Sequence, residues 1–233
     1  MSGTLILTGA IRPSWRGIVR KAPYTRLVDY LCGIRRWLEI ETLDHVIYCD
    51  ASGCRIPEKL FGSEKFESLT MDASEQAGRF EAGRAELESI QFILRHSRKK
   101  IESFYKCTGR LFVENFTELQ MKIIAAPNAE LFLRKWYGNH WADTRFFYIK
   151  AKTFQRLVEP RIRELTGQAY GGHVVESLFY EFLQTAWRLP QPVFLGHNGH
   201  TGSIYDGTYT DEEVRAAMRM LSLYGLEYFG IRQ

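Results

Sequence analysis

The apolar positions of this chain alternate between short β-rich runs and longer stretches with helical spacing. Thr4–Thr8 is an apolar run that ends at Gly9, which predicts a buried strand followed by a loop. Within Tyr24–Glu39, leucine and isoleucine recur at helical spacing with charged residues between them, which predicts an amphipathic helix. His45–Asp50 is a second buried strand. The order strand, helix, strand predicts a parallel crossover unit and an α/β fold.

The same alternation continues through the middle of the chain. A helix is predicted from Glu81 to Ser97, and Phe104–Arg110 then forms a strand that enters a glycine turn. Leu111–Phe116 is either extended or the start of a short helix. The other predicted elements are strands at Met121–Ala125 and Phe146–Ile149 and helices at Phe154–Glu164 and Val174–Trp187.

The C-terminal part combines a glycine-rich loop with a final helix. Phe194–Tyr209 is rich in Gly, His, Asn and Tyr, which predicts a functional loop or a flexible cover. Thr210 and Glu213 have the spacing of a capping box that opens a helix over Asp211–Tyr224. The apolar residues of this helix that we expect to face the core are Val214, Met218 and Leu221.

Length and composition predict one folded domain. A chain of 233 residues fits a single α/β core, and 45% hydrophobic with 25% charged residues is typical of soluble globular proteins. No apolar run reaches the roughly 18–20 residues that cross a bilayer, and no basic leader precedes the first strand. We therefore expect a soluble cytoplasmic protein whose four cysteines are reduced thiols.

The charge of the chain is too mild for a dedicated nucleic-acid binder. Lys and Arg exceed Asp and Glu by 31 to 27, a formal charge of +4, and no nucleic-acid-binding motif is present. Basic residues nevertheless cluster at two places, which suits anionic ligands or lipid headgroups and equally suits solvated helix faces. The first cluster is Arg12, Arg16, Arg20 and Lys21, and the second is Arg95, Arg98, Lys99 and Lys100.

The common catalytic signatures are missing. The sequence has no GxxxxGK[ST] loop, no GxGxxG after a strand, no HExxH, no GxSxG and no Asp-x-Asp pair. His197 and His200 lie close together in the glycine-rich loop, but no partner ligands accompany them in the sequence. We expect these histidines to contact substrate or water and predict no metal site.

Several short motifs in order along the chain carry a resemblance. They are Asp50-Ala51-Ser52-Gly53, a Gly-x-x-Glu helix start at Gly83–Glu86, Lys106-Cys107-Thr108-Gly109-Arg110, Arg145-Phe146-Phe147-Tyr148, Glu176 after Gly171-Gly172-His173, and the loop Gly196–Ser203. Together they resemble a group of bacterial lipopolysaccharide and capsule glycosyltransferases with a GT-A-like nucleotide-sugar fold. The resemblance extends to about Tyr209. The chain departs from the wider GT-A group because it lacks the metal-binding Asp-x-Asp pair, so a divalent cofactor is not supported.

Glycosyl transfer requires a partner for the negative charge that develops on the leaving phosphate. Arg110 can grip phosphate oxygens in a fork, and Lys106 can add a point charge, without a metal. The structural alternative for Arg110 is an ion pair with a carboxylate at a strand end, and the alternative for Lys106 is a solvated side chain. Thr108 and Gly109 belong to the same predicted donor-binding segment.

Carboxylates complete the predicted site. Glu176 begins an apolar helix and is our candidate for the general base, although a carboxylate there can equally be a helix cap. Asp50 ends a strand and can hold the ribose or base of a nucleotide. Further donor-binding candidates are Gly9 and Arg12 in the first loop and Glu86. The predicted substrate loop contributes His197, His200 and Ser203.

The sequence thus predicts a GT-A-like single domain, with a nucleotide-binding part at about residues 1–115 and an acceptor-side part at about residues 116–233. The predicted activity is sugar transfer from a nucleotide-sugar to a glycan or lipid-linked glycan at the bacterial cell surface, at the cytoplasmic face of the inner membrane and in contact with other glycan-assembly enzymes. The alternative is a non-catalytic α/β module that binds a nucleotide or an anionic glycan; under it Glu176 is only a helix cap.

Overall fold

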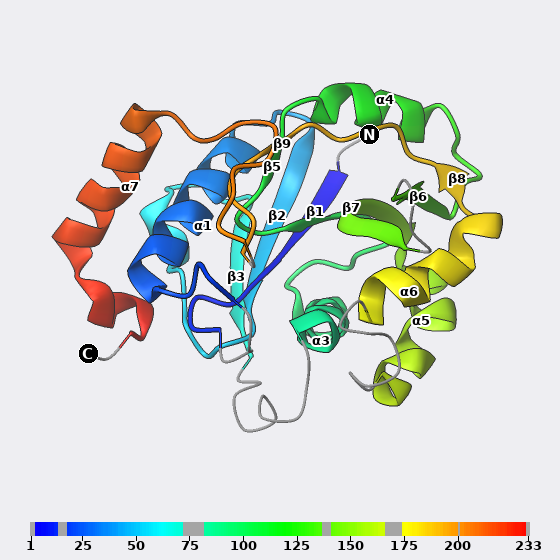
Figure 1. Ribbon diagram of the computed structural model, residues 1–233, viewed down its shortest axis with the longest axis horizontal. Coiled ribbons are helices and arrows are strands. Elements are labelled where there is room, and N and C mark those ends of the chain that lie inside the picture. Colours follow the sequence, from blue (N-terminus) through cyan, green and yellow to red (C-terminus); the bar gives the residue numbers. More distant parts are fainter. Residues whose placement is uncertain are drawn as a thin grey trace.

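A seven-stranded mixed sheet forms the centre of the molecule (Figure 1). The computed structural model describes residues 3–13, 18–71, 82–136, 141–165, 174–199 and 201–231. The strand order is β3-β2-β1-β4-β7-β6-β8. The first four strands in this order run parallel, β7 is antiparallel to both β4 and β6, and β8 is parallel to β6. The predicted α/β fold is confirmed.

The element bounds follow the chain. The strands are β1 (Gly3–Gly9), β2 (Leu43–Asp50), β3 (Phe66–Thr70), β4 (Ser103–Thr108), β5 (Phe112–Val113), β6 (Leu131–Lys135), β7 (Ala142–Lys150), β8 (Trp187–Arg188) and β9 (Phe194–Leu195). The α-helices are α1 (Pro23–Leu38), α3 (Ala82–His96), α4 (Phe116–Ile124), α5 (Ala151–Leu157), α6 (Val174–Glu181) and α7 (Asp211–Tyr224). Short 3-10 helices are η1 (Glu58–Leu60), η2 (Glu159–Glu164), η3 (Phe182–Gln184) and η4 (Leu226–Phe229).

The two faces of the sheet bury separate apolar clusters. Because side chains alternate along a strand, Leu5 and Leu7 of β1 join the cluster under α1, α4 and α7, whereas Ile6 joins the cluster under α3, α5 and α6. Figure 1 shows these helices on opposite sides of the sheet. A two-stranded sheet of β5 and β9 lies against α1 and joins the first cluster.

Most predicted elements around the parallel strands are confirmed. The strands at 4–8 and 45–50 and the helices at 24–39 and 81–97 match β1, β2, α1 and α3 within a few residues, although residue 81 lies outside the described chain. The capping box is also confirmed, because the Thr210 hydroxyl accepts from the Glu213 N–H and the Glu213 carboxylate accepts from the Thr210 N–H. These elements depend on local hydrophobic periodicity and on a local capping motif, and both can be recognised in the sequence.

Two helix predictions are wrong in extent. The helix predicted over Phe154–Glu164 breaks into α5 and η2, because Pro160 has no N–H to continue the α-helical hydrogen bonds and its ring clashes with the carbonyl one turn earlier. The helix predicted over Val174–Trp187 ends at Glu181, and Trp187 instead pairs with Phe132 of β6 in the sheet. Strand pairing at the sheet edge here overrides helical periodicity.

Two further predictions, one of a strand and one of a core residue, are wrong. Met121–Ala125, predicted as a strand, lies mostly in α4, where Ile123 faces the core with residues one turn earlier and Ile124 is exposed. Met218 is exposed on α7, and Ala217 takes the core position between Val214 and Leu221. Strands β3 and β6 were not predicted, because neither segment separates clearly from its polar surroundings in sequence.

Among the helices of the described residues, none combines sufficient length with the apolar character that crossing a membrane requires.

Candidate functional site

The C-terminal ends of three parallel strands and the start of β7 meet along one edge of the sheet. Thr8 of β1 pairs with Cys49 of β2 and with Thr108 of β4. Because β7 runs antiparallel to β4, with Phe146 opposite Cys107, its first residues lie beside Thr108. We call this surface the strand-end site. Open α/β sheets bind ligands at this position.

The buried Asp50 carboxylate holds the loop at residues 9–13 through hydrogen bonds. It is fully buried and accepts hydrogen bonds from the N–H groups of Ile11 (2.8 Å), Ser52 (2.8 Å) and Cys54 (3.1 Å). The hydroxyls of Tyr48 (2.8 Å) and Ser52 (2.6 Å) also donate to it. Burial raises the pKa of Asp50, and these donors oppose that shift. Because five protein groups already donate to its carboxylate, Asp50 serves to fix the conformation of this loop.

The loop after β1 has its own polar groups engaged. The Ala10 N–H donates to the Tyr30 hydroxyl (2.9 Å), and the Arg12 N–H donates to the Ser52 hydroxyl (2.9 Å). Gly9 packs against Tyr30, where a Cβ would come within 2.7 Å of the ring. The loop is therefore a fixed wall, and the exposed Arg12 side chain is the part of it that can reach a ligand.

Lys106 and Glu86 form a buried ion pair on the α3 face of the strand-end site. Lys106 is 1% exposed, and its ammonium contacts the Glu86 carboxylate and donates to the Thr144 carbonyl at 2.7 Å. The Thr8 hydroxyl donates to the same Glu86 oxygen at 3.0 Å. Burial lowers the pKa of Lys106 to about 7, and the carboxylates of Glu176 and Asp143 oppose it. Lys106 is not a solvated side chain.

Glu176 reaches the same region because α3 and α6 approach closely. A Cβ at Gly83 would lie 2.6 Å from the Val175 side chain, so only glycine permits this contact at the start of α3. Glu176 follows Val175 in the first turn of α6, is half-buried, and influences the pKa of Lys106. Gly83 thereby brings the predicted base near the Lys106–Glu86 pair. The motif residues 171–173 lie outside the described residues.

Arg110 lies on the other side of the site, beneath the glycine-rich loop. Gly109 makes the turn, donating its N–H to the Thr8 carbonyl at 2.8 Å, and a Cβ at Gly109 would approach that carbonyl to 3.0 Å. The half-buried Arg110 donates from Nε to the His197 carbonyl at 2.8 Å. Among the described residues no carboxylate pairs with Arg110. The strand-end ion pair considered as its structural alternative is therefore not formed with any carboxylate in the described part of the chain.

Two of the three residues predicted for the substrate loop, His197 and Ser203, lie in the described part of the chain. His197 Nδ1 lies 3.7 Å from an Asp29 oxygen, and Arg20 grips the same carboxylate through Nε and Nη2 at 2.5 and 2.7 Å. Burial, followed by Arg20, lowers the pKa of His197. The Ser203 hydroxyl hydrogen-bonds to the Thr201 hydroxyl at 2.6 Å within the loop. His200 lies outside the described residues.

Sequence reasoning missed Asp143 and used Arg145 only within the resemblance. Asp143 is 1% exposed and accepts from Arg145 Nε at 2.8 Å and Nη2 at 2.7 Å, while Arg134 adds a contact at 3.2 Å. The three residues come from β6 and the start of β7, at the strand-end site. The available signal was an Asp and an Arg at alternate positions where a strand begins, so both side chains share one face.

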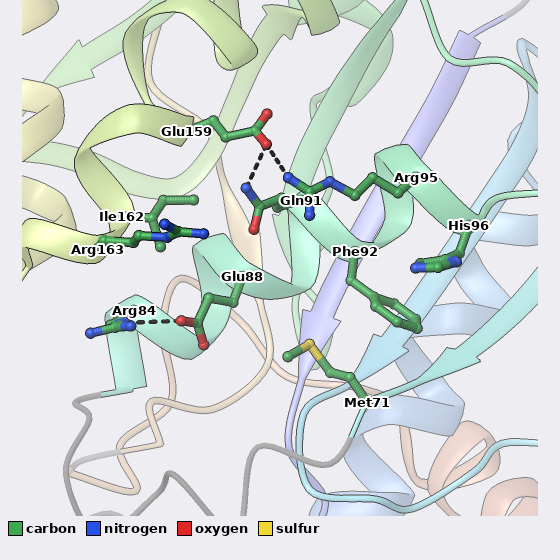
Figure 2. Close-up of a pocket in the computed structure, with 10 residues that line it drawn as sticks. All are labelled: Met71, Arg84, Glu88, Gln91, Phe92, Arg95, His96, Glu159, Ile162 and Arg163. Atoms are coloured by element: carbon green, nitrogen blue, oxygen red, sulfur yellow. Dashed lines mark hydrogen bonds and ion pairs between the residues drawn. The ribbon is translucent and has the colours of Figure 1, made fainter.

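A separate groove of about 320 Å³ runs along the outer face of α3 (Figure 2). There Arg84 pairs with Glu88 at 2.9 Å, and Glu159 of η2 accepts from Gln91 at 2.6 Å and contacts Arg95. None of the residues predicted for the site lines it. The strand-end site therefore remains the candidate. Across the described parts of the chain, no group of three His, Cys, Asp or Glu side chains is arranged to hold a metal.

Comparison with known proteins identifies the fold. No protein-family model and no curated protein matches the sequence. The structure of the glycosyltransferase GlyE from Streptococcus pneumoniae aligns with 81% of this chain at 10% identity and a TM-score of 0.50. The chain has a GT-A-like fold. It spans only 45% of the length of GlyE. A cytidylyltransferase from Leptospira borgpetersenii aligns over 100% of this chain and 99% of its own, at 8% identity and a TM-score of 0.49.

The GT-A-like fold brings the predicted donor residues to one edge but divides them between two faces. Thr8, Glu86, Lys106 and Glu176 gather on the α3 and α6 side, whereas Arg110 and His197 lie on the α1 side. Asp50 and Gly9 form the wall between strand ends. The predicted division near residue 115 into donor and acceptor parts stays a prediction.

Proposed function

We propose that this protein is a glycosyltransferase that moves a sugar from a nucleotide-sugar to a cell-surface glycan, such as lipopolysaccharide O-antigen or capsule. The observation that carries the proposal is the strand-end site of a GT-A-like fold, where cations and carboxylates gather at the ends of the parallel strands. A role at the cytoplasmic face of the inner membrane is part of the same proposal.

In the proposed reaction an acceptor hydroxyl attacks the anomeric carbon of the donor. The new bond joins that carbon to the acceptor oxygen, and the bond from the carbon to the phosphate oxygen breaks with its electron pair on the phosphate. Glu176 takes the hydroxyl proton. Arg110, with Arg12 at the rim, receives the negative charge on the leaving nucleotide, as a guanidinium does in a charge-assisted fork.

The remaining residues position these groups. Lys106 holds the Glu86 carboxylate, which also accepts from Thr8, so Glu86 presents a fixed oxygen toward the donor sugar. Asp50 fixes the loop over the nucleotide side. Because Arg110 supplies positive charge where many GT-A enzymes use a divalent ion, the proposed transfer does not require a metal.

A thermal-shift screen with UDP, GDP, CMP and dTDP tests donor binding, because a ligand specific for the folded state raises the Tm. Slow release of free nucleotide from the matching nucleotide-sugar would then support the enzyme. A Tm shift without any hydrolysis or transfer would favour the non-catalytic binding module. No shift with any nucleotide would contradict the enzyme and the nucleotide-binding form of the module, and would leave only the module that binds an anionic glycan.

A further inference from the structure

The Arg145 side chain is enclosed by aromatic rings at the β7 end of the strand-end site. Its guanidinium carbon lies 4.4 Å from the ring centroids of Trp136 and Phe194 and 4.9 Å from that of Tyr205. These rings come from the end of β6, from β9 and from the glycine-rich loop. Cations bind the faces of such rings. One residue therefore ties three segments together.

Arg145 is itself held rigidly. Its fork on Asp143 fixes the guanidinium plane, and burial of Asp143 strengthens the pair. The rings stacked on it are consequently fixed as well. Phe194 is 1% exposed, but Trp136 is 38% exposed although it is pinned by the cation. A large aromatic side chain that is held in place and open to solvent presents a preformed ring face that a ligand can stack on.

Trp136 lies at the same edge of the sheet as the strand-end site. Arg145, whose guanidinium contacts the Trp136 ring, precedes Phe146, which pairs with Cys107 of β4, and Trp136 directly follows β6 on the other side of β7. A sugar ring presents an apolar face of C–H groups that stacks on the negative face of an aromatic ring, and its hydroxyls suit polar neighbours such as Gln191, which accepts from Arg134 at 3.2 Å.

We propose that Trp136, fixed by Arg145 and Asp143, is the stacking platform for a sugar ring of the glycan acceptor. That the bound glycan is the acceptor rests on the proposed function. The contact between Trp136 and a sugar ring does not depend on catalysis. Arg145 and Asp143 act as positioning residues, and Trp136 is the residue that touches the sugar.

The chain offers a matched control in Trp187. It is 54% exposed on β8, where it contacts Phe132 with ring centroids 6.0 Å apart and has no contact with Arg145 in the described structure. Trp187→Ala removes the same side chain from the same sheet without disturbing the Arg145 cluster, which consists of Arg145 with Asp143, Trp136, Phe194 and Tyr205. Trp136→Phe keeps a smaller aromatic face in place.

The experiment measures binding to an array of bacterial surface oligosaccharides by the wild type, Trp136→Ala, Trp136→Phe and Trp187→Ala. We expect Trp136→Ala to lose about tenfold or more in glycan affinity, Trp136→Phe to lose less, and Trp187→Ala to match the wild type. Stabilisation by nucleotide should stay unchanged in all variants. The two measurements separate the glycan contact from donor binding. A failed nucleotide screen would contradict the proposed function, whereas the glycan measurement would still test the role of Trp136.

Three results would overturn the inference. They are no glycan binding by the wild type, equal losses in Trp136→Ala and Trp187→Ala, and a Trp136→Ala variant that binds glycans normally but loses affinity for vesicles of anionic phospholipid. If Trp136→Ala lowers the Tm strongly, Trp136→Phe decides: a reduced glycan affinity in a folded Trp136→Phe protein supports the platform, and unchanged binding contradicts it.

Discussion

Lys106 and Arg110 belong to one five-residue motif, yet their charged groups differ in burial and in hydrogen-bond partners. Lys106 is almost completely buried, contacts Glu86 and donates to a backbone carbonyl. Arg110 is half-buried, donates to the His197 carbonyl, and has no carboxylate partner among the described residues. The turn at Gly109 sends the two side chains to different faces of the sheet.

The difference assigns different tasks to the two cations. A buried ammonium that already touches a carboxylate has little left for a phosphate, so in the proposed mechanism Lys106 positions Glu86. A guanidinium with one donor used on a carbonyl still has the paired N–H groups that fit phosphate. Burial therefore distinguishes a positioning cation from a binding one more clearly than charge does.

The largest expected effect tests the α3 and α6 side. Glu176→Gln keeps the shape of the side chain but removes the proton acceptor, so turnover should fall by roughly 10²–10⁴-fold while nucleotide affinity stays the same. Initial transfer rates and thermal midpoints measure this. Glu181→Gln, at the exposed end of the same helix, is the matched control and should remain active.

A Glu176→Gln protein with full activity would show that Glu176 only caps α6. Its stability would then drop by about 0.3–1 kcal/mol, the size of a charge–dipole interaction at a helix N-terminus. The carboxylates to test next would be Glu86, Asp50 and Asp206 of the glycine-rich loop, which accepts from the Phe194 N–H at 2.8 Å.

The second prediction tests the other face. Arg110→Ala should weaken nucleotide binding by about 1.5–3 kcal/mol, which is roughly a 10- to 150-fold increase in Kd, with little change in Tm. Arg110→Lys should recover only part of this, because lysine lacks the fork. Titration calorimetry measures both, and Arg95→Ala on the outer face of α3 is the control. An Arg110→Ala protein that unfolds while its folded fraction binds normally would make Arg110 structural.

These contrasts also explain how far the sequence predicts the site. The periodicity around β1, α1, β2 and α3 is local, so the fold class and the strand ends could be predicted. The Lys-x-Thr-Gly-Arg motif identified both cations, but burial of Lys106 depends on Glu86 and Thr144, which are distant in sequence. The Arg145 cluster assembles four segments, and no local pattern carries that information.

The third prediction sharpens the contrast through pH. Lys106 has an ordinary pKa of 10.5 and a folded value of about 7, so between these values the unfolded chain binds more protons. The free energy of unfolding should therefore rise with pH across this window, by at most about 1.4 kcal/mol per pH unit, relative to Lys106→Met. Urea unfolding of both proteins from neutral to mildly alkaline pH gives the difference. A flat difference would mean that Lys106 keeps the pKa of a solvated lysine.

The smallest expected effect concerns divalent ions and bears on both cations at once. If Arg110 meets the phosphate charge and Lys106 holds Glu86 in an ion pair, neither the leaving group nor the carboxylate requires a metal. The sequence also lacks an Asp-x-Asp pair. We therefore expect nucleotide Kd values to be the same in EDTA and in manganese, measured by calorimetry on the same preparation. If affinity is lost in EDTA and restored by manganese, Glu86 would be the first ligand to test, because a bound cation would compete with Lys106 for its carboxylate.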